Sequence, residues 1–232
     1  MKWVDLRKWL PRRKDNDPEP IGPYDKNSIT VHYQGLEVLR EMTDADAKQL
    51  VMSDALEHIH RDWSREIPGV QGGGGVMYHL MIAPSGTVFQ CRDLGDYLWH
   101  CGNEYGNIHS IAVQVMCGPT TPPTDAQFTS LDKLLDELML KDPRLRAIYP
   151  HQFWSPTSCP GHVLVTYVEE ENMYTDADRK RDEQTATDAK VARDLIEARE
   201  SLVWIARAQR GLDVERKDTP FAKTNAPLDK RI

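Results

Sequence analysis

The sequence has few cysteines, and none of them is closely paired with another. Four cysteines occur in 232 residues, and no two of them form a CxxC motif. Four are too few for a disulfide framework in a chain of this length, and structural zinc sites usually take their ligands from such close pairs. Cys91 and Cys101 could form a disulfide if their strands were neighbours, but three of the four cysteines lie in apolar surroundings. We therefore expect free thiols.

Long apolar runs and an excess of positive charge are also missing. No stretch approaches about 18 consecutive apolar residues, so we expect no membrane-spanning helix. The first residues alternate charged and bulky side chains without an apolar core or a small-residue cleavage site, so we expect synthesis as a cytoplasmic protein without a signal peptide. The formal net charge of -7 argues against a nucleic-acid-binding protein, because such proteins need a basic patch to neutralise phosphates.

Apolar segments that are bounded by turn residues predict four strands. They are expected at 29–32, 76–83, 86–92 and 110–117. The last is a nearly continuous apolar run, which is typical of a strand buried on both faces.

Two helices are expected between these strands. Thr43 is a candidate cap for the first, whose apolar residues recur every four positions at Val51, Ala55, Ile59 and Trp63. Asp125 is expected to cap the second, which has one apolar face formed by Phe128, Leu131, Leu135 and Leu138. The glycines at 72–75 predict a flexible loop between the first helix and the next strand. Strands interleaved with helices predict an α/β fold, a central mixed β-sheet flanked by helices.

Composition divides the chain into three parts. Residues 1–25 form a leader, and the prolines in its second half favour an extended chain that wraps onto the domain. Residues 26–168 contain the predicted strands and helices. Residues 169–232 are densely charged and predict a helical C-terminal appendage followed by a disordered end. Its apolar stripe at Ala192, Leu195, Leu202 and Ala206 predicts packing on the domain or, alternatively, self-association or a protein partner.

Two histidines and one cysteine form a candidate set of metal ligands. His32 ends the first apolar segment, and Cys159 follows His151 by eight residues. Two imidazoles and one thiolate make a three-ligand zinc set that leaves one tetrahedral position open for water, as in hydrolytic zinc sites. Taken alone, a histidine at a strand end is more often a hydrogen-bonded structural residue, and an isolated cysteine is more often a buried apolar one.

The segments around these ligands resemble the zinc-dependent N-acetylmuramoyl-L-alanine amidases of the peptidoglycan-recognition-protein and phage-lysozyme type. The resemblance covers about residues 26 to 168 and rests on segments that occur in the family's order: Ile29 to His32, Tyr78 to Ile82 with Gly86 to Arg92, Trp99-His100 through Asn107 to Val113, and His151 to Gly161. It implies a central sheet whose strand ends hold zinc. It also implies hydrolysis of the amide between N-acetylmuramic acid and L-alanine in peptidoglycan.

The resemblance also implies roles for residues beyond the ligands. Tyr78 matches a tyrosine near the metal-bound water, where a phenol could stabilise the oxyanion. Thr157 matches a position held by lysine in some phage members and often by threonine in recognition-type members, and its hydroxyl could assist as a donor. His100 and Asn107 match positions that line the substrate groove. Arg92 could pair with a carboxylate of the stem peptide.

One position departs from many bacterial members of the family. Gln114 stands where they place a glutamate as general base, and an amide cannot accept a proton at neutral pH. The zinc would then activate water without a carboxylate partner, which it can do by lowering the pKa of that water to about 7. Glu104 could substitute only if its loop folded inward. His79 alternates with Tyr78, so we expect it to face away from the metal.

We therefore expect a peptidoglycan hydrolase that uses a zinc-activated water. The preferred setting is a phage or prophage endolysin, which another protein's membrane pore would release to the cell wall. One alternative is a cytosolic amidase that recycles muropeptides. The other is a catalytically weak peptidoglycan-binding module of a phage particle, and Gln114 is the feature that favours it.

Overall fold

A computed structural model describes residues 1–15, 25–62 and 72–171. Within these ranges six strands form one mixed sheet in the order β1-β4-β3-β5-β2-β6. The strands are β1 Trp3–Asp5, β2 Ser28–Tyr33, β3 Leu80–Ile82, β4 Val88–Gln90, β5 Ser110–Val115 and β6 Ala147–Pro150. β3, β5, β2 and β6 run parallel to one another, whereas β4 is antiparallel to β3 and parallel to β1. The predicted α/β fold with a central mixed sheet is confirmed.

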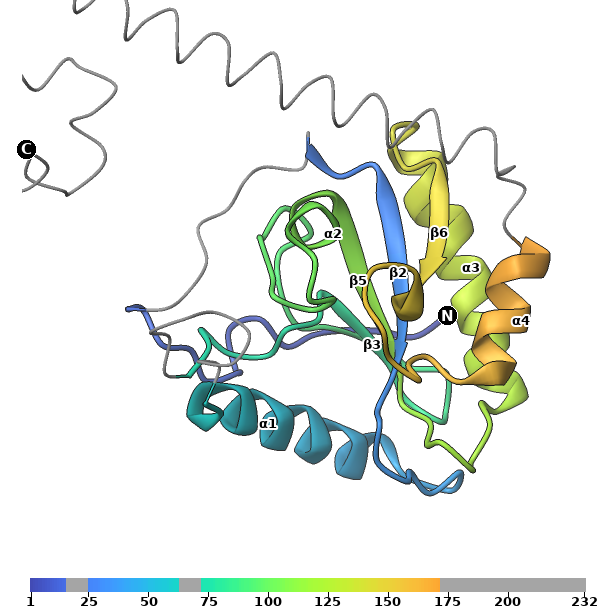
Figure 1. Ribbon diagram of the computed structural model, residues 1–232. Coiled ribbons are helices and arrows are strands. Elements are labelled where there is room, and N and C mark those ends of the chain that lie inside the picture. The colour runs from blue at the N-terminus through green and yellow to red at the C-terminus, as the bar shows by residue number, and fades with distance from the viewer. Residues whose placement is uncertain (16–24, 63–71, 172–232) are drawn as a thin grey trace, which may run out of the picture. The chain divides into compact units, whose positions relative to one another are not determined.

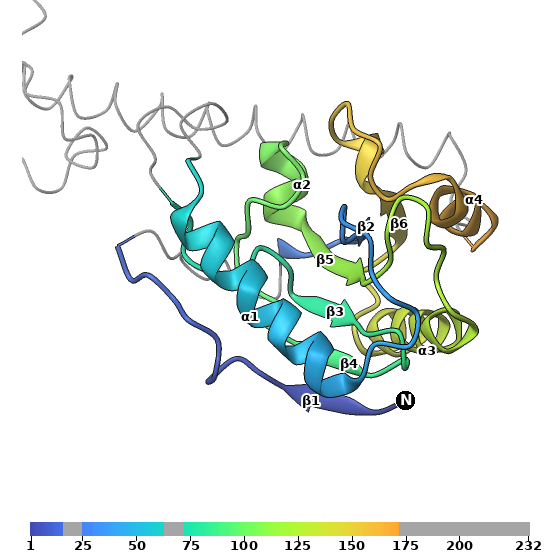
Figure 2. The same cartoon turned by 90° about the horizontal axis from the view of Figure 1, so that it is seen from below.

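Helices cover both faces of the sheet, as Figures 1 and 2 show. The helices are α1 Asp44–His60, α2 Glu104–His109, α3 Asp125–Lys141 and α4 His162–Glu171, with a short 3-10 helix at His151–Phe153. α3 and α4 pack on the face that carries Ile29, Val31 and Val113. α1 packs on the opposite face, against Met81 and Phe89. None of the described helices is long and apolar enough to cross a membrane.

Side-chain alternation along β2 places His32 on the face of the sheet that α1 covers. Val31 belongs to the core beneath α3 and α4, so its neighbour His32 points the other way. β2 lies between β5 and β6, and His32 is the register partner of Gln114 on β5. Because β2 is an interior strand, His32 is fully buried.

Both long helices begin at a threonine. Thr43 caps α1, and its side chain accepts a hydrogen bond from the backbone N–H of Asp46, as expected. The prediction that Asp125 caps α3 is wrong, because the cap is Thr124. Its hydroxyl accepts the N–H of Gln127, whose side chain in turn accepts the N–H of Thr124. This reciprocal capping box satisfies two backbone donors, which an Asp125 cap would not.

The glycine segment before β3 is packed rather than loose in its described part. Residues 72–75 are buried, and the N–H of Gly73 donates to the carbonyl of His58 at 2.7 Å. Gly72 has a φ of 77°, and a Cβ there would lie 2.0 Å from the carbonyl oxygen of Ile59. Only glycine allows the chain to pass this close to the end of α1. The expectation of a flexible loop at these four residues is therefore wrong.

Other predictions fall partly outside the described residues. Trp63 and the appendage beyond residue 171 are among those not described, so the helical tail and the domain limits remain predictions. The first residues, expected as a leader, place β1 at the sheet edge and bury Leu6 and Leu10. All four cysteines are free and buried, as expected.

Candidate metal centre and substrate pocket

The three predicted metal ligands come from neighbouring strand ends and the loop that follows them. His32 lies near the end of β2, and His151 begins the 3-10 helix directly after β6, the strand next to β2. Cys159 precedes α4, and its Sγ accepts the backbone N–H of Tyr33 at 3.4 Å. Parallel pairing of β2 and β6 therefore brings side chains more than a hundred residues apart in sequence to one place.

The ligand atoms converge, and the two distances from His32 match the spacing of a tetrahedral metal site. Nδ1 of His32 lies 3.2 Å from Nδ1 of His151 and 3.7 Å from Sγ of Cys159, and the three donor atoms all lie within 4.8 Å of one another. Tetrahedral zinc, with Zn–N near 2.05 Å and Zn–S near 2.3 Å, would place two nitrogens about 3.3 Å apart and nitrogen and sulfur about 3.6 Å apart. The three side chains therefore fit a zinc ion.

Burial keeps these three groups neutral in the absence of a cation. It holds the pKa of His32 well below its usual range, with a further lowering from His151. It also lowers the pKa of His151 and raises the pKa of the Cys159 thiol to about 12. Neutral imidazoles are ready to bind a metal, whereas the thiol must release its proton as it does so.

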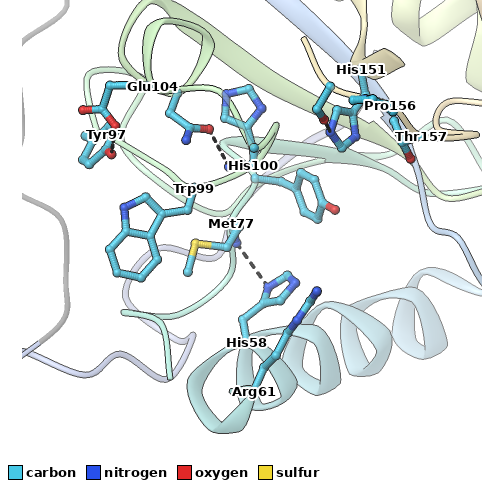
Figure 3. Close-up of a pocket in the computed structure, with 14 residues that line it drawn as sticks. His58, Arg61, Met77, Tyr97, Trp99, His100, Glu104, His151, Pro156 and Thr157 are labelled. Carbon is cyan, nitrogen blue, oxygen red and sulfur yellow. Dashed lines mark hydrogen bonds between the residues drawn. The ribbon is translucent and has the colours of Figure 1, made fainter. Parts of the chain in front are cut away.

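One of the three candidate ligands, His151, lines a pocket of about 610 Å³ (Figure 3). Tyr78, His100, Asn107, His151 and Thr157 line it, together with His58, Arg61, Met77, Tyr97, Trp99, Gly102, Glu104, Ser155 and Pro156. Figure 3 shows His58 and Arg61 rising from the end of α1, while His151, Pro156 and Thr157 form the wall across from them. The pocket is thus bordered by the end of α1, by residues 97–107, which include the start of α2, and by residues 151–157.

A family model for N-acetylmuramoyl-L-alanine amidases matches residues 23–162, more than half of the chain. The chain belongs to this amidase family. A search of curated proteins found no match.

Several solved structures share the fold of this amidase-family chain. Peptidoglycan recognition protein SD from Drosophila matches with a TM-score of 0.60 and 16% identity, covering 76% of this chain and 98% of that one. Drosophila PGRP-LB matches with a TM-score of 0.55 and 16% identity, covering 75% and 96%. Peptidoglycan recognition protein LE, solved with tracheal cytotoxin, matches with a TM-score of 0.58 and 17% identity, covering 72% and 92%. At these identities the similarity shows the fold.

Two predicted catalytic side chains of the amidase-family chain lie at the pocket. The half-buried ring of Tyr78 packs edge-on against His32, with 5.1 Å between the ring centroids. Burial raises the pKa of its phenol, and the nearby Cys159 raises it further, so the hydroxyl keeps its proton and can donate. Thr157 is exposed on the pocket wall across from His58 and Arg61. Its hydroxyl accepts the N–H of Cys159 at 3.2 Å.

The two residues expected in the substrate groove also line the pocket, but their polar atoms face inward. Nδ1 of His100 lies 3.0 Å from Nε2 of His32. The side-chain oxygen of Asn107 accepts the backbone N–H groups of His100 and Cys101 at 2.9 and 3.0 Å. His100 therefore contacts the candidate ligand His32 directly, whereas Asn107 holds the backbone of His100.

Arg92 lies where a substrate carboxylate does not reach it. Its side chain is buried, its Nε donates to Asp96 at 3.0 Å, and it is not part of the pocket wall. The carbonyl of Asp96 also lies 2.9 Å from Nζ of the buried Lys26 and 3.0 Å from Nε2 of His79. This geometry corrects the expected stem-peptide contact, because Arg92 belongs to a buried polar network that braces the loop before α2.

Among the described residues, Arg61 is the arginine that lines the pocket, and the sequence analysis did not identify it. It follows α1, one helical turn after His58, which accepts the N–H of Met77 at 3.3 Å. The three-residue spacing at a helix end was the available signal, since such residues share one side of the helix.

The remaining polar candidates are placed as follows. Gln114 is buried beside His32, and its Nε2 donates to the carbonyl of Tyr33 at 3.3 Å. Glu104 lines the pocket, where it accepts a hydrogen bond from the hydroxyl of Tyr97 at 3.0 Å. His79 bonds to Ala112 and Asp96 and to none of the three candidate ligands. Strand alternation does not explain this, because both Tyr78 and His79 precede β3.

Proposed function

We propose that the protein is a zinc-dependent hydrolase that cleaves the amide between N-acetylmuramic acid and L-alanine in peptidoglycan. The observation that carries this proposal is the convergence of His32, His151 and Cys159, whose donor atoms lie within 4.8 Å of one another, with His151 on the wall of a pocket. Bound zinc would polarise the scissile carbonyl and lower the pKa of a water. Family membership supports the same reaction.

The chain's own residues would orient the substrate and stabilise charge. Tyr78 keeps its phenol proton and would donate to the oxygen of the scissile amide as negative charge develops there. Thr157, which also lines the pocket, would assist as a second donor. With Arg92 buried, Arg61 supplies the positive charge on the pocket wall, and we propose that it meets a carboxylate of the stem peptide.

The alternative is a peptidoglycan-binding module with little catalysis. Gln114 supports it, because a buried amide next to His32 cannot act as a general base. The LE recognition protein was solved bound to a monomeric diaminopimelic acid-type peptidoglycan, which shows that this fold serves for binding in that relative. The retained Tyr78 favours catalysis.

Product analysis separates the two functions. Purified protein would be incubated with cell-wall sacculi and with short soluble muropeptides, and the products would be identified by mass spectrometry. Release of free peptide beginning with L-alanine, from protein that contains about one zinc per chain, would support the amidase. Binding to sacculi without cleavage by zinc-loaded protein would favour the module.

The biological setting is a separate proposal. An endolysin should clear suspensions of intact sacculi, whereas a recycling amidase should prefer soluble muropeptides. Turnover on the two substrates, compared at equal zinc loading, distinguishes these roles.

A further inference from the structure

We infer that His100 is a positioning residue for the metal ligand His32, whose Nε2–H donates a hydrogen bond to Nδ1 of His100. This inference rests on the proposed metal site. In this arrangement His100 fixes both the tautomer and the ring orientation of His32, which solvent does not reach.

The tautomer of His32 follows from the position of its two ring nitrogens. Nδ1 faces the other two ligands, at 3.2 Å from Nδ1 of His151 and 3.7 Å from Sγ of Cys159, so this nitrogen must offer its lone pair to the metal. The ring proton of a neutral imidazole then sits on Nε2. Because His32 is fully buried, that N–H needs a protein acceptor. Nδ1 of His100 lies 3.0 Å away.

The protonation of His100 follows in turn. An imidazole that accepts at Nδ1 carries its own proton on Nε2. This atom is buried, and the backbone carbonyl of Gly106 is an acceptor available to the ring.

The backbone of His100 is fixed by α2. The side-chain oxygen of Asn107 accepts the N–H of His100 at 2.9 Å and that of Cys101 at 3.0 Å. Asn107 is itself buried within α2. Two hydrogen bonds to one oxygen hold the turn before the helix, and with it the acceptor that faces His32.

The acceptor is neutral, which distinguishes this site from the common pairing of a ligating histidine with a carboxylate. A carboxylate would pass negative charge to the metal through the imidazole. Cys159 already contributes a thiolate, which lowers the positive charge on zinc. A neutral imidazole behind His32 orients the ligand without lowering that charge further, which suits a site where Gln114 provides no base.

Two nearly isosteric variants test the inference in the full chain. His100→Asn places a carbonyl oxygen near the position of Nδ1, whereas His100→Leu has a similar shape and no acceptor. We expect His100→Leu to lose about 10- to 100-fold in zinc affinity, the usual effect of removing a partner of a metal-bound histidine. His100→Asn should stay within about threefold of the wild type by the same reasoning. Affinity would be measured by competition with a chelator.

Controls separate positioning from general loosening of the core. His79 is also buried, with its ring centroid 6.4 Å from that of His100, and it contacts no metal ligand. His79→Leu should change the melting temperature without a comparable loss of zinc affinity. Equal zinc affinity in folded His100→Leu and His100→Asn would overturn the inference, as would a loss in His79→Leu as large as that in His100→Leu.

A measurement on the wild-type protein does not depend on the folding of any variant. Long-range ¹⁵N–¹H NMR spectra of the zinc-loaded protein should show the protons of His32 and His100 on Nε2. A proton on Nδ1 of His100 would overturn the inference. Zinc binding without amide cleavage would overturn only the proposed function, whereas the absence of zinc binding would overturn both.

Discussion

Replacing Tyr78 with phenylalanine should separate catalysis from metal binding and folding. The ring of Tyr78 packs edge-on against His32 at an interplanar angle of 61°, and phenylalanine keeps this contact. Only the hydroxyl is lost, so the free energy of unfolding should fall by less than about 1.5 kcal/mol. The zinc content should not change, because the phenol is not one of the three converging ligands.

Turnover should fall much more than stability. Removal of one donor to a developing oxyanion costs about 10²- to 10³-fold in kcat, or about 2.7 to 4 kcal/mol. KM should change little, since this hydrogen bond strengthens only as charge develops. Because burial raises the pKa of the phenol, the loss should be the same at pH 6 and pH 9, both of which lie below even the usual tyrosine pKa of about 10.

The assay is mass-spectrometric turnover of a soluble muropeptide, with zinc content and melting temperature measured on the same preparation. Tyr167→Phe is a matched control, because its hydroxyl donates to Asp132 on α3, on the face of the sheet away from the pocket. Unchanged kcat in Tyr78→Phe would refute the oxyanion role and return Tyr78 to packing.

The other predictions address the metal, the substrate, a helix cap and the appendage. Cys159→Ser should lose both zinc and activity, because two histidines hold the ion poorly; active protein without zinc on elemental analysis would contradict this. Arg61→Gln should raise KM about tenfold for a muropeptide with free carboxylates, which corresponds to the loss of one charge-assisted hydrogen bond. KM for the amidated analogue should not change. An equal effect on both substrates would exclude carboxylate recognition. Thr124→Ala should destabilise the protein by about 1 kcal/mol in denaturant unfolding, whereas Asp125→Ala should cost less, since Asp125 only complements the helix dipole. A chain ending at residue 171, the end of α4, should retain zinc and cleave soluble muropeptides, because every described residue that lines the pocket precedes it. Loss of zinc in a folded truncation would show that the appendage completes the site.

The clustering of the three candidate metal ligands could be predicted from the sequence because their chemistry is rare. Few residue types bind zinc, so His32, His151 and Cys159 form a specific combination once they lie in the order of a known family. Four of the six described strands could also be predicted, since apolar segments such as 110–117 need a buried sheet, but β6 Ala147–Pro150 was not among them. β1 had no such signal, because its three residues include an aspartate and its position depends on pairing with β4.

Side-chain direction was the part that the sequence did not determine. Arg92 was expected at the substrate, yet Asp96, four residues further on, pairs with it inside the protein. An arginine with a carboxylate that close in sequence has a local partner available, and once the guanidinium is buried it needs that partner, because an unpaired buried charge is costly. Arg61 reaches the pocket because of where α1 ends, which the helical period alone does not fix.

The contact between His32 and His100 explains why the site depends on the whole fold rather than on its ligands alone. His32 receives its register from β5 and β6, and its ring orientation from a turn that α2 holds through Asn107. His151 depends on the same sheet, because it continues β6 beside β2. A perturbation of α2 should therefore weaken metal binding even though α2 contributes no ligand. The same helix also supplies Glu104 and Asn107 to the pocket wall, so we expect such a perturbation to change the pocket as well.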